Sequence, residues 1–169
     1  MKTNLKRIGF AILSFIILIV FDQWTKYLAV EHLMNKEPFI IIDGVFQLRY
    51  LENRGAAFGM MQGQQTFFLI TGIIAVIVLA YVYFKLPWEK RFLPLRAVAM
   101  FIAGGAVGNM IDRVALGYVV DFFYFELIDF PIFNVADIYV TVGVALLIIF
   151  VLFYYKEDDF DAIFPPKKK

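Results

Sequence analysis

Four apolar segments dominate this chain and limit it to a few folds. They cover about residues 8–30, 66–84, 95–111 and 138–155. Each is close to the length of about 20 apolar residues that a helix needs to cross the hydrocarbon core of a bilayer. Because a chain in lipid must satisfy its backbone polar groups internally, segments of this kind cross as helices. We therefore predict an all-α membrane protein with four transmembrane helices.

The composition agrees with this class and excludes several others. Hydrophobic residues make up 62% of the 169 residues, well above the usual content of a soluble domain. The chain has no cysteine and a single histidine, His32, so we expect no disulfide, no metal site and no cofactor. The net charge of +1 gives no reason to expect a nucleic-acid partner. Residues 1–169 are too few for a second large domain, and we expect one polytopic domain.

The first apolar segment has an alternative interpretation as a cleaved signal peptide. Lys2, Lys6 and Arg7 precede its apolar stretch, as they would in a signal peptide. No small-residue cleavage site follows, however, and Asp22 and Lys26 continue the helical register. We therefore expect a retained helix.

Basic residues predict the orientation of the helices, since they concentrate in the cytoplasmic connections of membrane proteins. They precede the first segment, crowd the connection between the second and third segments, and follow the fourth. The first connection holds only three of them, and residues 114–134 hold none. We therefore place both termini and a solvated tail, about residues 156–169, in the cytoplasm. Residues 31–65 and 114–136 should face outward.

Polar residues gather at the predicted outer ends of all four helices. They are Asp22 and Lys26 in the first segment, Asn53 and Arg54 before the second, Asn109, Asp112 and Arg113 at the end of the third, and Asn134 and Asp137 at the start of the fourth. Ionisable residues are costly within a membrane and are usually functional there. Four coincident polar helix ends therefore favour a functional site.

Each of these residues also has a purely structural interpretation. Asn134 and Asp137 can cap the fourth helix. Arg113 can extend to the lipid headgroups, and Asp22 can form an ordinary ion pair with Lys26 one turn away. Taken singly, the two interpretations are equally good. Taken together, on one side of the membrane, the residues favour a site.

Two outer segments adjoin these helix ends. In the first, about residues 39–61, Asp43 and Gly44 stand between two apolar strands, which is a strong hairpin signal and predicts a primed turn. The second, about residues 114–136, is rich in aromatic residues, which is typical of interfacial anchoring. We expect the first to form a small extracytoplasmic sheet and the second a lid. Asp121 stands out in the second as an acid among apolar neighbours.

Five short motifs, in this order, resemble those of the lipoprotein signal peptidases, the type II signal peptidases of bacteria. They are DQWTK at 22–26, NRGAAF at 53–58, GNMIDR at 108–113, VVDF at 119–122 and FNVAD at 133–137. The first two are weak signals alone, but GNxxDR followed by FNxAD between the right segments is specific. The resemblance covers the chain apart from about its last dozen residues.

The resemblance implies a membrane aspartic peptidase with Asp121 and Asp137 as its catalytic pair. It decides against Asp112, which the residues alone leave as a third candidate. The other motif positions are implied to hold the pair and the substrate or to tie helices and loops together. They are Asn53, Gly55, Asn109, Arg113, Asn134, Asp22, Asp112 and Lys26, of which Lys26 receives no specific role.

Elimination on the residues alone leads to the same kind of chemistry. The chain has no cysteine, and its only serine, Ser14, lies deep in the first apolar segment without a lysine or histidine to activate it. Water activated by a carboxylate remains. Two neighbouring acids cannot both ionise easily, so one keeps a proton while the other acts as a base.

The resemblance also implies the setting in which the chain works. The expected substrate is a prolipoprotein, cut just before a cysteine that carries diacylglycerol, and globomycin-type lipopeptides are the expected inhibitors. The expected location is the cytoplasmic (inner) membrane of a bacterium, with the site near the outer leaflet among membrane lipids. Nothing in the sequence demands a dimer, and we expect a monomer.

Two other classes of protein compete with this interpretation. A small four-helix transporter would use a membrane carboxylate, but it would place that acid near the bilayer midplane. A non-catalytic membrane scaffold would need no special acids. Neither class explains five motifs in this order.

Overall fold

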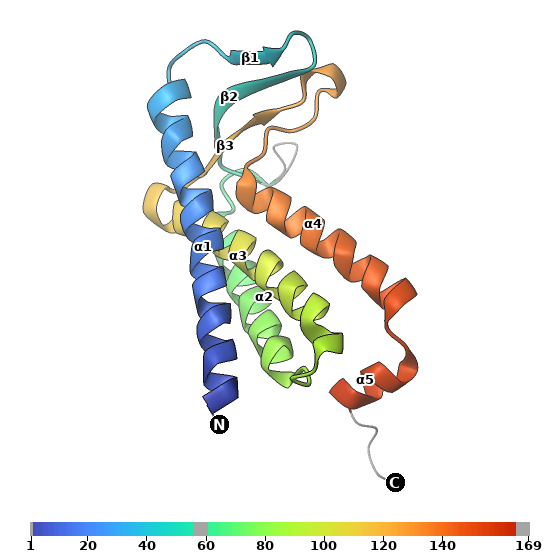
Figure 1. Ribbon diagram of the computed structural model, residues 1–169. Helices are drawn as coiled ribbons and strands as arrows, with labels where there is room; N and C mark the ends of the chain where they lie inside the picture. The colour runs from blue at the N-terminus through green and yellow to red at the C-terminus, as the bar shows by residue number, and fades with distance from the viewer. Residues whose placement is uncertain (1, 56–60, 165–169) are drawn as a thin grey trace.

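The computed structural model describes residues 2–55 and 61–164, which form a bundle of long helices with a small sheet at one end (Figure 1). Within these residues, four helical stretches are long and apolar enough to cross a membrane, and this confirms the predicted fold class. They are Arg7–Leu33, Gln65–Lys85, Lys90–Leu116 and Val135–Tyr154. The start of α1 and all of α5 lie at the end of the bundle opposite the sheet (Figure 1).

The strands lie between the long helices along the chain. In order, they are α1 (Lys2–Leu33), β1 (Phe39–Ile42), β2 (Phe46–Asn53), α2 (Gln65–Lys85), the 3₁₀ turn η2 (Lys90–Phe92), α3 (Leu93–Leu116), β3 (Val119–Tyr124), the 3₁₀ turn η3 (Glu126–Ile128), α4 (Val135–Ile149), the π-helical turn η4 (Phe150–Tyr154) and α5 (Glu157–Ile163). α3 continues past residue 111 and stops at Gly117, whose φ of +78° suits glycine. Asp112 and Arg113 therefore lie within the helix.

α3 is the central helix and contacts α1, α2 and α4. Two glycines allow the close approach. A Cβ on Gly108 would lie 2.5 Å from Oδ2 of Asp22, and a Cβ on Gly105 would collide with the carbonyl oxygen of Ala136. Small residues let helix backbones approach closely in lipid. The glycines thus bring the first and last membrane helices onto one helix near the sheet.

The three strands form one antiparallel sheet in the order β1-β2-β3. β3 pairs with β2 from Val119, opposite Asn53, to Tyr124, opposite Gln47. β3 belongs to the segment 114–136, for which the sequence predicts a lid. This part of the segment is hydrogen-bonded into the same sheet as the hairpin.

The hairpin turn is not of the predicted primed type. Gly44 has a φ of +66°, but Asp43 is not among the residues with positive φ. Both primed turns need a positive φ at the first central position, which is costly for a residue with a Cβ. The connection is a three-residue loop instead, because Ile42 pairs with Phe46, and a register shift in β1 accommodates it. The primed-turn prediction is therefore wrong.

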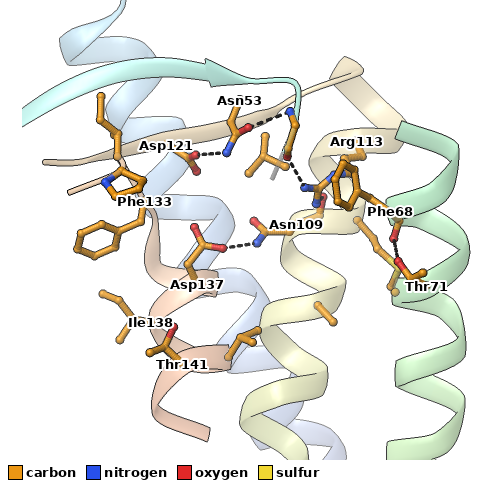
Figure 2. A pocket seen from close by; sticks show the side chains of 18 of the residues that line it. Asn53, Phe68, Thr71, Asn109, Arg113, Asp121, Phe133, Asp137, Ile138 and Thr141 are labelled. Atoms are coloured by element: carbon orange, nitrogen blue, oxygen red, sulfur yellow. Dashed lines mark hydrogen bonds between the residues drawn. The ribbon is translucent and has the colours of Figure 1, made fainter. Parts of the chain in front are cut away.

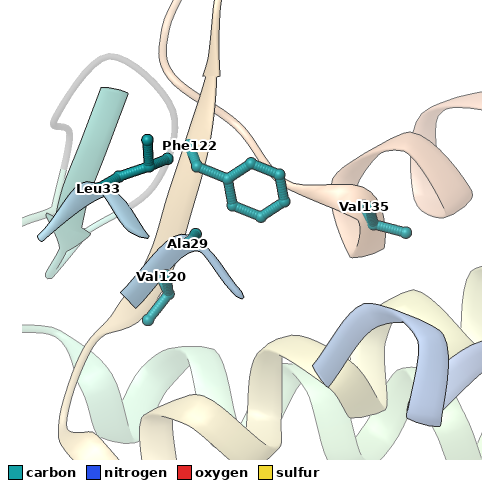
Figure 3. Packing of buried hydrophobic residues seen from close by; sticks show 5 residues of the cluster. All are labelled: Ala29, Leu33, Val120, Phe122 and Val135. Atoms are coloured by element: carbon teal, nitrogen blue, oxygen red, sulfur yellow. The ribbon is translucent and has the colours of Figure 1, made fainter. Parts of the chain in front are cut away.

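A buried apolar cluster joins the sheet to two helices (Figure 3). Its members are Ala29 and Leu33 of α1, Val120 and Phe122 of β3, and Val135 of α4. Side chains alternate across a strand, so Asp121 points away from the face that Val120 and Phe122 bury. Removing such apolar surface from water stabilises the fold by about 25 cal/mol per Å². The cluster thus fixes the strand that carries Asp121.

A second apolar cluster closes the opposite end of the bundle. Its members are Leu86, Phe92, Tyr155 and Ile163. Arg91 holds α5 there, because its guanidinium donates to both carboxylate oxygens of Asp159, at 2.8 and 2.6 Å. The sequence predicts a solvated tail over residues 156–169, whereas Ile163 is 4% exposed because α5 turns this one apolar residue onto the cluster. The final lysines, residues 167–169, lie outside the described part.

Candidate active site

Asp121 and Asp137 border one cavity of about 740 Å³ beneath the sheet, among α2, α3 and α4. Figure 2 shows Asp121 reaching it from β3 and Asp137 from the start of α4. The residues with polar side chains around the cavity are Asn53, Thr71, Asn109, Arg113, Asp121, Asp137 and Thr141, and Gly55 also borders it. Most of the remaining wall is apolar. An apolar cavity with a few convergent polar groups is the usual form of a binding or active site.

Asp121 is held by two amide side chains from other elements. Its Oδ2 accepts from Nδ2 of Asn53 at 2.8 Å, and its Oδ1 accepts from Nδ2 of Asn134 at 2.6 Å. Asn53 is oriented in turn by the N–H of Gly55, which donates to its Oδ1 at 2.9 Å. Asp121 is 1% exposed, so both of its oxygens depend on protein donors.

Asp137 combines a structural role with a place on the cavity. Its Oδ2 accepts from the backbone N–H of Asn134 at 3.1 Å, and Oδ1 of Asn134 accepts from the N–H of Asp137 at 3.0 Å. This reciprocal pair is a capping box at the start of α4. The other oxygen, Oδ1, accepts from Nδ2 of Asn109 at 2.8 Å. Asp137 therefore caps α4, as its structural interpretation expects, and also borders the cavity.

The electrostatic setting of Asp121 favours its neutral form. The pKa of this carboxyl is raised to about 7, mainly by burial and in second place by the charge of Asp137. The hydrogen bonds from Asn53 and Asn134, and the charge of Lys26, lower the pKa of Asp121 and offset only part of this rise. Near neutral pH, Asp121 can therefore hold or release a proton.

Arg113 supplies a positive charge at the cavity. Its guanidinium lies over the ring of Phe68, 4.9 Å from the centroid, and donates to the backbone oxygens of Gly55 at 3.4 Å and Asn109 at 3.3 Å (Figure 2). It also borders the cavity that contains both acids. These contacts direct the side chain across the top of the cavity.

A buried cluster of charges stands beside the cavity. Nζ of Lys26 lies 2.9 Å from Oδ2 of Asp22 and 3.0 Å from Oδ2 of Asp112. Oδ1 of Asp22 also accepts from the N–H of Ala136 at 2.9 Å, and Oδ2 of Asp112 accepts from the N–H of Val120 at 3.1 Å. Asp22 thus joins α1 to α4, and Asp112 joins α3 to β3. Neither carboxylate borders the cavity.

The structure brings together all ten predicted site residues. They are Asp22, Lys26, Asn53, Gly55, Asn109, Asp112, Arg113, Asp121, Asn134 and Asp137. Arg54 lies apart, because it pairs with Glu52 at 2.9 Å and stands over the ring of Tyr118. Ser14 belongs to α1 and does not border the cavity. The last three residues of the NRGAAF motif, 56–58, lie outside the described residues.

Gln23 is a site residue that sequence reasoning missed. Its Nε2 donates to Oδ1 of Asp112 at 2.9 Å, to Oδ2 of Asp22 at 3.2 Å and to the carbonyl oxygen of Gly108 at 3.2 Å. A polar residue directly after Asp22 within a membrane-length helix is a usable signal, because an unpaired amide would be costly there.

Within the described residues, no group of three or more His, Cys, Asp or Glu side chains could hold a metal ion.

The membrane-length helices and the two acids at one cavity are the features of a small polytopic membrane enzyme. Two solved bacterial membrane enzymes share this fold. One, 35% identical, has a TM-score of 0.75 and covers 96% of this chain and 94% of its own. The other, 37% identical, has a TM-score of 0.73 and covers 88% of this chain and 96% of its own.

The chain belongs to the signal peptidase II family. The family described as "Signal peptidase (SPase) II" matches residues 14–153. A lipoprotein signal peptidase of Caldanaerobacter subterraneus is 45% identical over 80% of this chain and 90% of its own length. Another, from Streptococcus thermophilus, is 46% identical over 84% of this chain and 90% of its own length. The resemblance carried by the five motifs is thereby confirmed, and the chain is a membrane peptidase.

Proposed function

We propose that this protein is an aspartic endopeptidase that removes the signal peptide from prolipoproteins. It cuts just before the cysteine that carries diacylglycerol, using water activated by Asp121 and Asp137. Membership of the signal peptidase II family supports the substrate class. The observation that carries the mechanism is that both acids border one cavity, each held by amide donors.

The chemistry follows from two acids that share one proton. The ionised acid takes a proton from water, and the resulting hydroxide attacks the scissile carbonyl carbon. The protonated acid donates to the carbonyl oxygen, which stabilises the tetrahedral intermediate. When the C–N bond breaks, the acid that took the proton from water passes it to the leaving amine. The pKa of about 7 at Asp121 keeps the pair near the singly protonated state at neutral pH, and the pair titrates as a unit.

The side chains around the pair have separate tasks in this scheme. Asn53, Asn109 and Asn134 hold the carboxylates by donated hydrogen bonds, so that the acids do not reorient as their charge changes. Arg113 faces the same cavity with a fixed positive charge and can bind the backbone carbonyls of the substrate. No covalent intermediate is required.

The location of the cavity suits a lipidated substrate. It lies among apolar helices at the sheet end of the bundle, so acyl chains can stay in the bilayer while the peptide backbone reaches the acids. From the distribution of basic residues we place this end near the outer leaflet of the bacterial cytoplasmic membrane, with both termini in the cytoplasm. We further propose that the protein works as a monomer among membrane lipids and is blocked by globomycin-type lipopeptides.

Cleavage of a purified, diacylglyceryl-modified prolipoprotein tests the mechanism. Asp121→Asn and Asp137→Asn should each abolish cleavage, because an amide can neither take a proton from water nor share one with its partner. The double variant should be no worse than either single variant, since the two acids act as a unit. Asp129→Asn is the control: Asp129 is exposed and has a φ of +47°, which asparagine tolerates, so cleavage should be almost normal. Wild-type turnover by Asp121→Asn would disprove the assignment.

Cysteine labelling in intact cells tests the orientation. Asp43→Cys, in the exposed hairpin turn, should react with an impermeant thiol reagent, whereas Glu89→Cys, in the connection between α2 and α3, should not. Reaction at position 89 from outside would reverse the proposed topology.

A further inference from the structure

Lys26 is a buried cation whose hydrogen-bonding capacity is fully used. Its side chain is 3% exposed, and its ammonium group has three donors. These face Oδ2 of Asp22 at 2.9 Å, Oδ2 of Asp112 at 3.0 Å and Oδ1 of Asn109 at 2.9 Å. Two of the partners are acids that would hold the cation in place without help. The third is a neutral amide that touches the proposed catalytic pair.

The contact with Lys26 decides which way the amide of Asn109 faces. An ammonium group has no acceptor, so only the oxygen of Asn109 can face it. The amide nitrogen must then point the other way, where it donates to Oδ1 of Asp137 at 2.8 Å. A flipped amide would set its NH₂ group against the ammonium and its oxygen against the carboxylate. Both contacts would be repulsive in a site with little water to screen them.

The same oxygen also links Lys26 to the other acid. Oδ1 of Asn109 accepts a second hydrogen bond, from Nδ2 of Asn134 at 3.1 Å. That NH₂ group also donates to Oδ1 of Asp121 at 2.6 Å. One ammonium group therefore fixes one amide oxygen, and this oxygen aligns donors for both acids.

We propose that Lys26 is a positioning residue for the reaction, which orients the Asn109 amide and, through it, the hydrogen bonds to Asp137 and Asp121. This assignment rests on the proposed aspartic mechanism. Asp22 and Asp112 seat the ammonium, and Lys26 itself touches neither acid of the pair nor the cavity. Its orienting effect on the two acids is transmitted by Asn109.

Cleavage kinetics of full-length purified Lys26→Met test the proposal. We expect kcat to fall by about ten- to a hundredfold, because misplaced catalytic groups cost rates of this size, with KM changed less than about twofold. The matched control is Lys36→Met, which should cleave like wild type. Lys36 is exposed, and within the described part of the chain its ammonium group donates to the backbone oxygen of Glu31 alone. Unchanged kcat in folded Lys26→Met would overturn the proposal.

The pH profile separates positioning from a merely structural role. Lys26 also lowers the pKa of Asp121 by its charge, so its removal should move the profile to higher pH. The charged groups around the pair are Asp22 and Lys26 from α1, Asp112 and Arg113 from α3, Asp121 from β3 and Asp137 from α4. A structural role would lower the folded fraction and leave the profile in place, which would contradict the proposal.

A double-mutant cycle tests transmission through Asn109. In the Asn109→Ala background, Lys26→Met should lower kcat by less than about twofold, because the group that it orients is already absent. Fully additive losses would show that Lys26 acts by another route. Lys26→Met leaves Asp22 and Asp112 without their cation and could fail to fold for that reason. In that case the double variant Lys26→Met/Asp112→Asn, which keeps the net charge of the cluster, is used in its place. Wild-type kcat and pH profile in that variant would overturn the proposal.

Failure of this proposal and failure of the proposed function look different. If the mechanism is wrong, Asp121→Asn or Asp137→Asn will cleave. If only the role of Lys26 is wrong, those variants will be inactive while folded Lys26→Met cleaves like wild type.

Discussion

Two helices of this protein begin with the same local device and use it differently. α4 and α5 each have an aspartate in the third position, Asp137 and Asp159, which accepts from the backbone N–H of the residue before the helix, at 3.1 and 2.8 Å. Asp159 is also paired with Arg91, and this pairing lowers its pKa to about 2. Asp137 receives a neutral amide from Asn109 instead and faces Asp121 across a cavity.

The difference shows that a capping motif alone does not identify a site. At Asp159 the negative charge is neutralised by an arginine, so the carboxylate is satisfied and unreactive. Asp137 shares its cavity with Arg113, but no ion pair joins these two side chains in the described part of the chain. A second acid stands nearby instead. The partners of a carboxylate, more than its place in the helix, decide whether it can do chemistry.

The largest expected effect comes from removing the charge at each of these two caps. Asp137→Asn should lower the cleavage rate by at least about a thousandfold, as expected when a member of a catalytic unit is lost. Asp159→Asn should leave kcat within about twofold of wild type, because α5 lies at the far end of the bundle. Cleavage assays on both purified variants measure this contrast. Comparable losses in the two variants would mean that the caps are equivalent.

A smaller effect is expected from truncating one side chain in each apolar cluster. Phe122→Ala should destabilise the protein by about 3–5 kcal/mol and also reduce cleavage, because it loosens the strand that carries Asp121. Ile163→Ala should cost about 2–4 kcal/mol and leave the activity of the folded protein unchanged. Thermal unfolding together with activity per folded molecule tests the pair. Normal specific activity in Phe122→Ala would show that β3 is held by its hydrogen bonds alone.

Asp121 and Asp159 should make the stability of the protein depend on pH in opposite directions. The folded pKa of Asp121, about 7, lies above its ordinary value of 3.8, so its folded form binds a proton that the unfolded chain has lost. Stability should therefore fall by roughly 4 kcal/mol as pH rises from about 4 to 7. The pKa of Asp159 is lowered, so its contribution is present above about pH 4 and is lost toward pH 2.

Unfolding temperatures across this pH range measure the two contributions. Asp121→Asn should reduce the decline between pH 4 and 7, and Asp159→Asn should reduce the loss of stability below pH 4. An unchanged decline in Asp121→Asn would mean that another group causes it.

The smallest effect is expected at the hairpin, far from both caps. Gly44 has a φ of +66°, and a β-branched residue there costs about 1–2 kcal/mol. Gly44→Val should therefore shift the strands and impair cleavage several-fold, while membrane insertion stays normal. Gly9→Val in α1 is a suitable control, because a Cβ added there meets no atom within 4 Å among the described residues beyond its own stretch of helix, and its φ is not positive. Equal turnover in both variants would make the hairpin a passive loop.

The sequence allowed the helices and the site to be predicted better than the sheet and the tail. Long apolar segments and the capping pattern at Asn134 are local signals, and the motif resemblance assigned Asp121. The pairing of β3 with β2 joins residues about 70 positions apart, which no local pattern reports. The prediction of a primed turn at Asp43 was wrong, because the hairpin signal indicates the position of a loop but not its length. Docking of Ile163 depends on Leu86 and Phe92, which lie about 70 or more positions earlier in the chain.

The hydrogen bond between Ala136 and Asp22 has a consequence for biosynthesis. It joins residues 114 positions apart, one in the first membrane helix and one in the last. During translation, α1, α2 and α3 can enter the membrane before the start of α4 has been made. Until then Asp22 lacks this donor, Asn109 lacks its aspartate, and the cavity lacks a wall. On the proposed mechanism, a chain that ends before α4 or is incompletely inserted should therefore be inactive, and peptidase activity should begin only when α4 is in place.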